Sequence, residues 1–281
     1  MIKRMNILSK TLKFIFVITA AICTLGLLLL AGVISLFPTN QEIRGCMTTK
    51  MYQVELCPRS KSYVPISEVS PYLIKTVVLT EDSSFWTHQG FDFDEMKKSL
   101  EKNLKTGKFK RGGSTITQQL AKNLFLTEEK TLLRKFREAI ITLRLEKVLT
   151  KKEILERYLN VVHFGKDLFG IKAAAQFYFR KSPSQLNIIE SAFLTFLLPS
   201  PQKYSVSYSK HQLTPFAEHR LHQIIDNLYQ YQRISEIEYQ TAKMELASFL
   251  RPTEKAIEEI KSDTLAPEVV SEEETAEPED D

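Results

Sequence analysis

Apolar residues recur along most of this chain with the spacing of helices rather than of strands. The clearest case begins at Thr150, where the capping-box pattern Thr-x-x-Glu precedes an apolar stripe over 154–162. Asn187 and Glu190 repeat this pattern before a second stripe, which two prolines end. The spacing also predicts helices over 67–81, 94–105, 114–125, 131–149, 168–179 and 216–249. The pattern therefore predicts a mostly α protein with long loops.

An uncharged run over 14–37 differs from these amphipathic stripes. Its 24 residues would form a helix about 36 Å long, enough to cross a ~30 Å hydrocarbon core. Four bases and no acid precede it, so the positive-inside rule predicts a cytoplasmic segment 1–13 and export of everything after residue 37. A cleaved signal peptide would have a shorter apolar region of about 7–15 residues. We therefore expect an uncleaved transmembrane helix at 14–37.

Charge is distributed unevenly along the 281 residues, whose formal net charge is +4. Residues 264–281 hold eight acids and no base, which leaves a net charge of +12 for residues 1–263. The segment 251–281 is predicted to be an acidic disordered tail. The basic remainder suits an anionic partner, namely phosphate, a membrane surface or nucleic acid. The composition excludes a wholly disordered chain, a collagen-like repeat and a disulfide miniprotein.

Two of the three cysteines lie in a predicted stalk over 38–65. Cys46 and Cys57 are eleven positions apart, and outside the cytoplasm such a pair can oxidise. A disulfide and two free thiols fit the sequence equally well. Cys23 lies within the apolar run and is interpreted as a small apolar residue.

The segment 81–92 carries the first candidate for chemistry. Glu81 follows the apolar run 77–79, and a carboxylate that loses solvation there would have a raised pKa, as a general base needs. The alternative is a surface Glu-Asp pair that ends a helix. The Asp-Phe-Asp triplet at 92–94 resembles a metal motif, but it is interpreted as a helix N-terminus.

A second candidate begins with two glycines at 112 and 113. Glycines before a helix let the backbone approach an anion, which the free N–H groups of the first turn can bind. Thr115, Gln118, Gln119 and Lys122 follow with helical spacing on one face, which suits a sugar–phosphate ligand. The alternative is a solvated helix face.

Two other segments are interpreted as structural from their residues alone. Arg134, Lys135 and Glu138 have the spacing of ordinary helix ion pairs, and the segment 152–160 has the pattern of a packed helix. Residues 97–111 contain seven bases interleaved with apolar residues, which favours an anionic membrane surface. Nucleic acid is disfavoured as a partner because the segment is predicted to be exported.

Taken in order, these segments resemble the family-51 peptidoglycan glycosyltransferases in their monofunctional form, over residues 66–245. The first motif of that family, Glu-Asp-x-x-Phe-x-x-His-x-Gly, is intact from Glu81 to Gly90. The second runs unbroken from Arg111 to Asn123, the third covers 134–138, and the fourth is the helix at 154–160. Two positions where the family tends to have glycine hold Arg180 and Gln232, the latter in a turn before residue 234.

The resemblance implies a two-lobed, lysozyme-like glycosyltransferase domain over 66–250, with one lobe dipping into the bilayer. It implies polymerisation of lipid II into β-1,4 glycan strands, with inversion and release of undecaprenyl pyrophosphate. Glu81 would be the catalytic base, and Glu138 a second acidic residue of the catalytic site, near the phosphates. The resemblance also assigns substrate-binding roles to Asp82, Phe85, His88, Arg111, Gly113, Ser114, Thr115, Thr117, Gln118, Gln119, Lys122, Asn123, Arg134, Lys135 and Arg137.

No organic cofactor is expected, although Glu138 could hold a divalent cation such as Mg²⁺ or Mn²⁺. The expected partners are lipid II, the growing glycan strand and membrane phospholipid, together with other cell-wall synthesis and division proteins, at the bacterial inner membrane. Transpeptidase motifs do not occur in the required order. Two rival functions are a lytic enzyme that cleaves glycan and a non-catalytic membrane scaffold.

Overall fold

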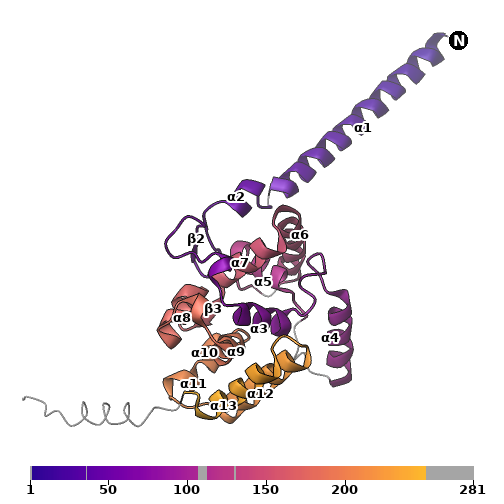
Figure 1. The fold of residues 1–281 in the computed structure, drawn as a ribbon. Coiled ribbons are helices and arrows are strands. Elements are labelled where there is room, and N and C mark those ends of the chain that lie inside the picture. Colours follow the sequence, from indigo (N-terminus) through magenta and orange to yellow (C-terminus); the bar gives the residue numbers. More distant parts are fainter. Residues whose placement is uncertain (1, 36, 107–112, 130, 251–281) are drawn as a thin grey trace, which may run out of the picture.

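The computed structural model describes residues 2–35, 37–106, 113–129 and 131–250, and helices make up most of them (Figure 1). Arg111 and the predicted tail 251–281 lie outside these residues. Two short antiparallel sheets pair β1 (Met47–Thr48) with β2 (Glu55–Leu56) and β3 (His163–Gly165) with β4 (Leu168–Phe169). The helices are α1 (Ile2–Ser35), α2 (Asn40–Arg44), η1 (Ile66–Glu68), α3 (Pro71–Glu81), α4 (Phe93–Thr106), α5 (Ile116–Phe125), α6 (Leu132–Val148), α7 (Lys151–Val161), α8 (Ile171–Phe179), η2 (Pro183–Gln185), α9 (Ile188–Leu197), α10 (Pro201–Tyr204), α11 (Val206–Ser209), α12 (Pro215–Gln230) and α13 (Glu236–Ser248).

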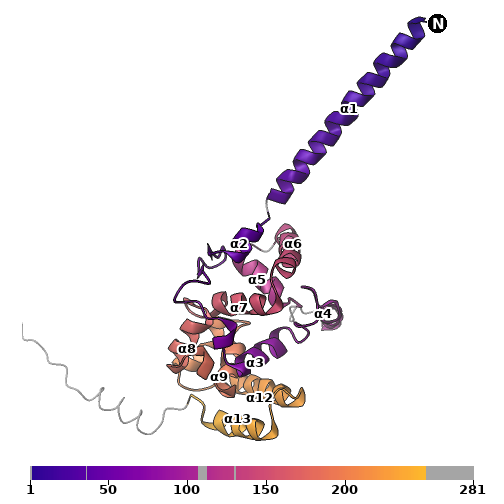
Figure 2. The ribbon, with the colours of Figure 1, turned by 45° about the horizontal axis from the view of Figure 1, so that its top comes forward.

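Helix α1 extends away from the rest of the protein in both ribbon views (Figures 1 and 2). Across the described ranges, no helix has both the length and the apolar character that crossing a membrane requires. The predicted transmembrane helix at 14–37 is therefore not confirmed and stays a prediction.

Side-chain caps set the starts of the helices where the sequence predicted them. Thr150 and Asn187 each form a capping box, at the starts of α7 and α9. Asp92 accepts a hydrogen bond from the Glu95 backbone N–H at 2.8 Å, as expected of a helix N-terminus. The predicted span 216–249 is divided into two helices, because Ser235 caps a new helix after the turn.

Two of the residues with left-handed backbone stand at positions where the sequence led us to expect glycine. Arg180 ends α8 with φ of 57°, and Gln232 lies between α12 and α13 with φ of 55°. Glycine adopts this conformation without steric cost, whereas other residues are strained by it. The glycine preference expected at both positions therefore has a backbone cause.

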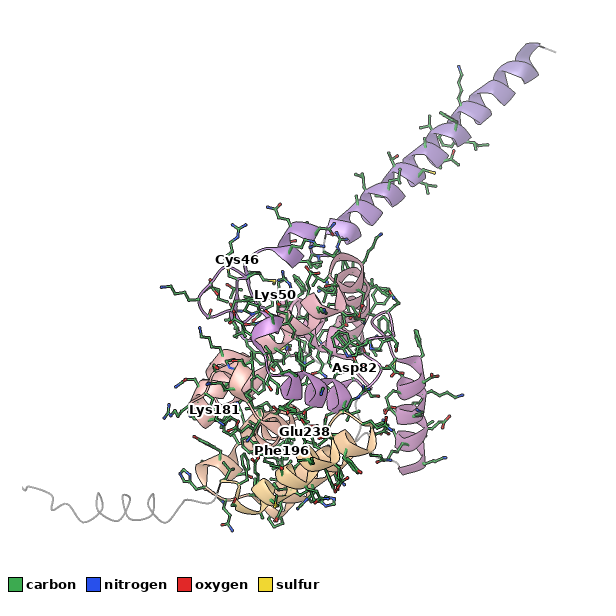
Figure 3. The ribbon with its side chains drawn as sticks, viewed as in Figure 1. Cys46, Lys50, Asp82, Lys181, Phe196 and Glu238 are labelled. Carbon is green, nitrogen blue, oxygen red and sulfur yellow. A yellow bond between two sulfur atoms is a disulfide. The ribbon has the colours of Figure 1, made fainter. Side chains whose placement is uncertain are left out.

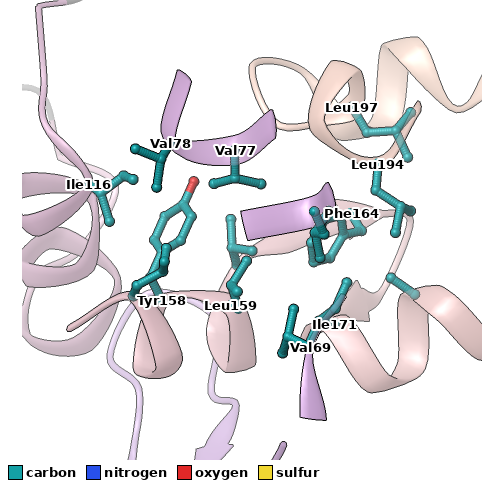
Figure 4. Close-up of a cluster of buried hydrophobic side chains, with 14 of the residues drawn as sticks. Val69, Val77, Val78, Ile116, Tyr158, Leu159, Phe164, Ile171, Leu194 and Leu197 are labelled. Carbon is teal, nitrogen blue, oxygen red and sulfur yellow. The ribbon is translucent and has the colours of Figure 1, made fainter. Parts of the chain in front are cut away.

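Helix α9 forms the centre of the core. All ten of its residues are buried, seven of them apolar, as expected of a helix at the centre of a core. Helices α3, α12 and α13 pack against it, while α5 packs on α6 and α7. A cluster that includes Val77, Tyr158, Phe164 and Leu194 joins these two groups (Figure 4).

The segment 38–65 is not a separate stalk. Ile43, Leu56 and Val64 are buried in the common core, and the segment includes α2 and the β1–β2 hairpin. The prediction that the folded domain begins only at residue 66 is therefore wrong, because apolar side chains of this segment complete its core.

A disulfide joins Cys46 and Cys57 across the hairpin, with Cα atoms 4.1 Å apart, which settles the choice left open by the sequence. The hairpin loop also contacts α5: the backbone N–H groups of Lys50 and Met51 donate to carbonyl oxygens at 124 and 123. These carbonyls belong to the last turn of a helix, which lacks donors of its own. Figure 3 labels Cys46 and Lys50 in this region.

Candidate active site

Glu81 is the last residue of α3, and its carboxylate is held by a neighbouring amide. Gln119 on α5 donates from Nε2 to Oε2 of Glu81 at 2.9 Å. Burial raises the pKa of Glu81, and this hydrogen bond opposes the rise. A carboxylate with a raised pKa and one ordered donor is suited to act as a general base.

Tyr158 fixes the orientation of that amide. Its hydroxyl donates to Oε1 of Gln119 at 3.0 Å, so Nε2 of the same amide is directed at Glu81. Tyr158 is fully buried, and burial raises its pKa, so the hydroxyl keeps its proton. Sequence reasoning treated the helix that carries Tyr158 as structural and missed this role, because only the fold brings it to Gln119.

Asp82 and His88 link the first motif to the second. The buried carboxylate of Asp82 accepts a hydrogen bond from the Ile116 backbone N–H at 2.9 Å and lies 2.9 Å from His88 Nε2. The Gly90 N–H donates to His88 Nδ1 at 3.0 Å, so Nε2 is the nitrogen that donates to Asp82. Asp82 therefore anchors the start of α5 next to Glu81.

A cluster of cations surrounds Glu138. This buried carboxylate accepts from Arg134 Nη1 at 2.9 Å and is also paired with Lys135 Nζ. Lys135 approaches the Ser114 hydroxyl at 3.5 Å. Burial lowers the pKa of Lys122 on α5, and the charge of Glu138 opposes that change. Three cations around one carboxylate leave a net positive charge, which suits an anionic ligand.

Helix α5 connects the carboxylate of Glu81 to this cluster. Gln119 donates a hydrogen bond to Glu81, while burial lowers the pKa of Lys122 and the charge of Glu138 opposes that change. Gln119 and Lys122 are three residues apart, which corresponds to roughly 4.5 Å along the helix. The charges of Lys122 and Arg220 both lower the pKa of Glu81, so both lie near it. Arg220 is on α12, remote in sequence, and no spacing could have identified it.

Several residues predicted to bind substrate lie in the interior instead. Phe85 is fully buried under Lys151, and Thr117 donates to Glu146 Oε1 at 2.6 Å. Thr115 and Gln118 are buried and form the capping box that starts α5. In this structure the polar groups of these residues satisfy the backbone and the core, and their predicted role in substrate binding stays a prediction.

The remaining candidates lie around the start and end of α5. A side chain at Gly113 would meet the Met96 Cα at 3.3 Å, so a glycine there allows α4 to approach. Asn123 is buried at the end of the helix, and Arg137 is exposed on α6.

A comparison with known families identifies the family of this protein. The transglycosylase family model matches residues 48–229. The chain belongs to this family. A biosynthetic peptidoglycan transglycosylase of Nitrosospira multiformis is 44% identical over 166 residues, which are 59% of this chain and 70% of that protein. One of Chromobacterium violaceum is 48% identical over 142 residues, 50% of this chain and 62% of that protein.

The chain thus spans about two thirds of the length of these transglycosylases. Penicillin-binding protein 1A from Haemophilus influenzae is 26% identical over 45% of this chain and 15% of that one, with a TM-score of 0.28, too low to bear on the fold. The family assignment confirms the resemblance recognised in the motifs and makes the protein a member of a glycosyltransferase family.

The side chains around Glu138 are cations, and they are not a set of ligands that fits a metal ion. Its two carboxylate oxygens already accept from Arg134 and Lys135. Across the described ranges, no group of three or more His, Cys, Asp or Glu side chains is arranged to hold a metal. In this structure Glu138 is paired with Arg134 and Lys135 and holds both cations in place.

Proposed function

We propose that this transglycosylase polymerises lipid II into β-1,4 glycan strands and releases undecaprenyl pyrophosphate. One observation carries the proposal: a single helix, α5, holds a candidate base through Gln119 and reaches a cation cluster through Lys122. Transfer of a glycosyl group from a pyrophosphate needs both a base for the acceptor and positive charge for the leaving group.

In the proposed reaction, Glu81 removes the proton from the 4-hydroxyl of the acceptor sugar. The freed oxygen forms a bond to the anomeric carbon of the donor, on the face opposite the pyrophosphate, and the bond to the pyrophosphate oxygen breaks. This displacement inverts the anomeric centre. Lys122, Arg134 and Lys135 stabilise the negative charge that develops on the departing oxygen.

A lytic enzyme is the second candidate, because it too would use one glutamate on a helical fold. Cleavage of glycan releases no pyrophosphate and needs no cluster of cations. The charges around Glu138 therefore favour synthesis over cleavage. A non-catalytic scaffold would have no need of the ordered contact between Gln119 and Glu81.

Membrane attachment is part of the proposal and rests on two features. The apolar run 14–37 and the bases before it favour a single anchor with the catalytic domain outside the cytoplasm. Helix α6 also begins with the exposed apolar residues Leu132, Leu133 and Phe136, interleaved with the cations of the site. Exposed apolar side chains next to cations suit the interface of an anionic bilayer.

Helix α4 extends this surface. Phe93, Leu100 and Leu104 are exposed on it, and the positions between them hold lysines at 97, 98 and 102 together with acids at 94, 95 and 101. Membrane phospholipid is therefore a proposed partner together with lipid II and the growing strand. The two-lobed, lysozyme-like arrangement and the association with division proteins stay predictions.

The decisive experiment incubates the full-length protein in detergent with lipid II and separates the products on a gel. We expect polymer from the wild type and a loss of about 10²–10⁴-fold in Glu81→Gln, the usual contribution of a positioned general base. Glu236→Gln, an exposed substitution on α13, is the matched control and should retain full activity. Digestion of preformed glycan without synthesis would support the lytic alternative.

A further inference from the structure

A cavity of about 740 Å³ lies between the segment 54–63 and helix α8. Its size is typical of ligand sites, and none of the residues that surround Glu81 or Glu138 lines it. Val54, Tyr63, Phe169 and Ala173 supply an apolar lining. The cavity is therefore a second concave surface, separate from the reaction described above.

The rim of this cavity is positively charged. Lys61, Lys172 and Lys181 line it together with one acid, Glu55. The ammonium group of Lys172 donates to the backbone carbonyl of Lys61, so these two exposed lysines are neighbours. Within the described part of the chain, neither forms an ion pair with a carboxylate, whereas Lys181 is paired with Glu190 at 2.7 Å. An acidic segment with apolar residues would complement both the rim and the lining.

The described fold ends close to this cavity. The ring of Phe249 lies 6.2 Å from that of Phe179, which is two residues before Lys181. Asn187, at the start of α9, also donates to Glu245 of α13 at 3.2 Å. The chain therefore leaves the fold on the side of the molecule that carries Lys181 (Figure 3).

The sequence beyond residue 250 contains a segment of the required chemistry. Residues 265–270 read Leu-Ala-Pro-Glu-Val-Val, and three consecutive glutamates follow at 272–274. The fourteen residues 251–264 can span up to roughly 45–50 Å. Because Phe249 contacts Phe179, two residues before Lys181, a linker of this length is long enough to bring residue 265 to the rim.

We propose that residues 265–274 of this chain dock in the cavity. The apolar residues of 265–270 lie on its lining, and Glu272, Glu273 and Glu274 pair with Lys61 and Lys172 at its rim. Each exposed ion pair contributes little by itself, so the apolar contacts supply most of the binding and the charges select the position.

Hydrogen exchange on the full-length protein in detergent tests this proposal. We expect the amides of 265–270 to exchange about tenfold slower than in a synthetic peptide of residues 251–281. The double variant Lys61→Glu and Lys172→Glu should abolish this protection. Its matched control, Lys203→Glu with Lys210→Glu, reverses two exposed lysines elsewhere and should leave the protection intact. Equal exchange in the peptide and the protein would overturn the proposal.

Cross-linking locates the occupant. A carbodiimide joins a carboxylate to a nearby amine, and we expect links from 272–274 to Lys61 and Lys172 in the wild type. Mixing ¹⁴N- and ¹⁵N-labelled protein distinguishes the source, because links within one chain never combine the two labels. Mixed-label links would assign the cavity to the segment of a second copy and overturn docking in the same chain. Neither readout involves lipid II, so this test is independent of the proposed reaction.

Discussion

The contact between Gln119 and Glu81 makes a quantitative prediction about the pH dependence of the reaction. Leucine at position 119 removes the donor that lies 2.9 Å from Oε2 of Glu81. Burial then raises the pKa of Glu81 without opposition from this bond. A hydrogen bond to a charged group is worth about 1.5–3 kcal/mol, and one pKa unit corresponds to about 1.4 kcal/mol. Gln119→Leu should therefore raise the pKa of Glu81, because the anion loses an interaction of this size.

The assay is kcat/KM for lipid II polymerisation as a function of pH, which reports groups of the free enzyme. Activity rises with pH as Glu81 loses its proton, and the lost hydrogen-bond energy should move this limb to higher pH in Gln119→Leu by about 1–2 pH units. Gln240→Leu, on the exposed side of α13, is the matched control and should leave the limb in place.

A loss of stability must be separated from this effect. Gln119→Leu leaves the buried Tyr158 hydroxyl without its partner, at a cost of about 1–3 kcal/mol. The double variant Gln119→Leu with Tyr158→Phe removes the amide and the hydroxyl together. It should recover part of that stability, while the rising limb of the pH profile should stay at the higher pH. A folded Gln119→Leu protein with an unmoved limb would refute the assignment of Glu81 as the base.

Three further outcomes are expected. Lys122→Met should raise KM for lipid II by about 10- to 100-fold, because a charge-assisted contact to phosphate is lost, and an unchanged KM would remove Lys122 from the phosphate site. Arg180→Gly and Gln232→Gly should each raise the free energy of unfolding by up to about 1 kcal/mol, measured by denaturant titration, because glycine relieves the left-handed strain. A reporter active only outside the cytoplasm, fused after residue 250, should be active, and activity of a cytoplasmic reporter alone would reverse the proposed topology.

Local patterns predicted the helices well, because their determinants lie within a few residues. Thr150 and Asn187 meet their capping partners three positions away, so the sequence alone identifies both starts. The segment 38–65 was misjudged because its few apolar residues have no regular spacing, and their burial depends on elements far along the chain. Ile43 is an example, since it is fully buried by contacts that no local pattern encodes.

The sequence motifs located the site, but they did not separate residues that could face a ligand from residues that hold the fold together. Glu81 and Glu138 were identified through the resemblance, and the structure places both near cations. Thr117 and Gln118 were assigned to the substrate, although buried contacts use their polar groups. A polar residue on a short helix has the same sequence signature whether it faces a ligand or the core, so only the packing distinguishes these cases.

The many contacts of α5 constrain any effort to redesign this enzyme. The helix has ten residues, and two of its polar side chains, Thr117 and Gln119, are committed to α3, α6 and α7 through Glu81, Glu146 and Tyr158. A library that randomises α5 would therefore lose folded members faster than it gained new specificities. The exposed face at the start of α6, where Leu132 and Phe136 have few neighbours, offers a better place to adapt the protein to a different lipid carrier.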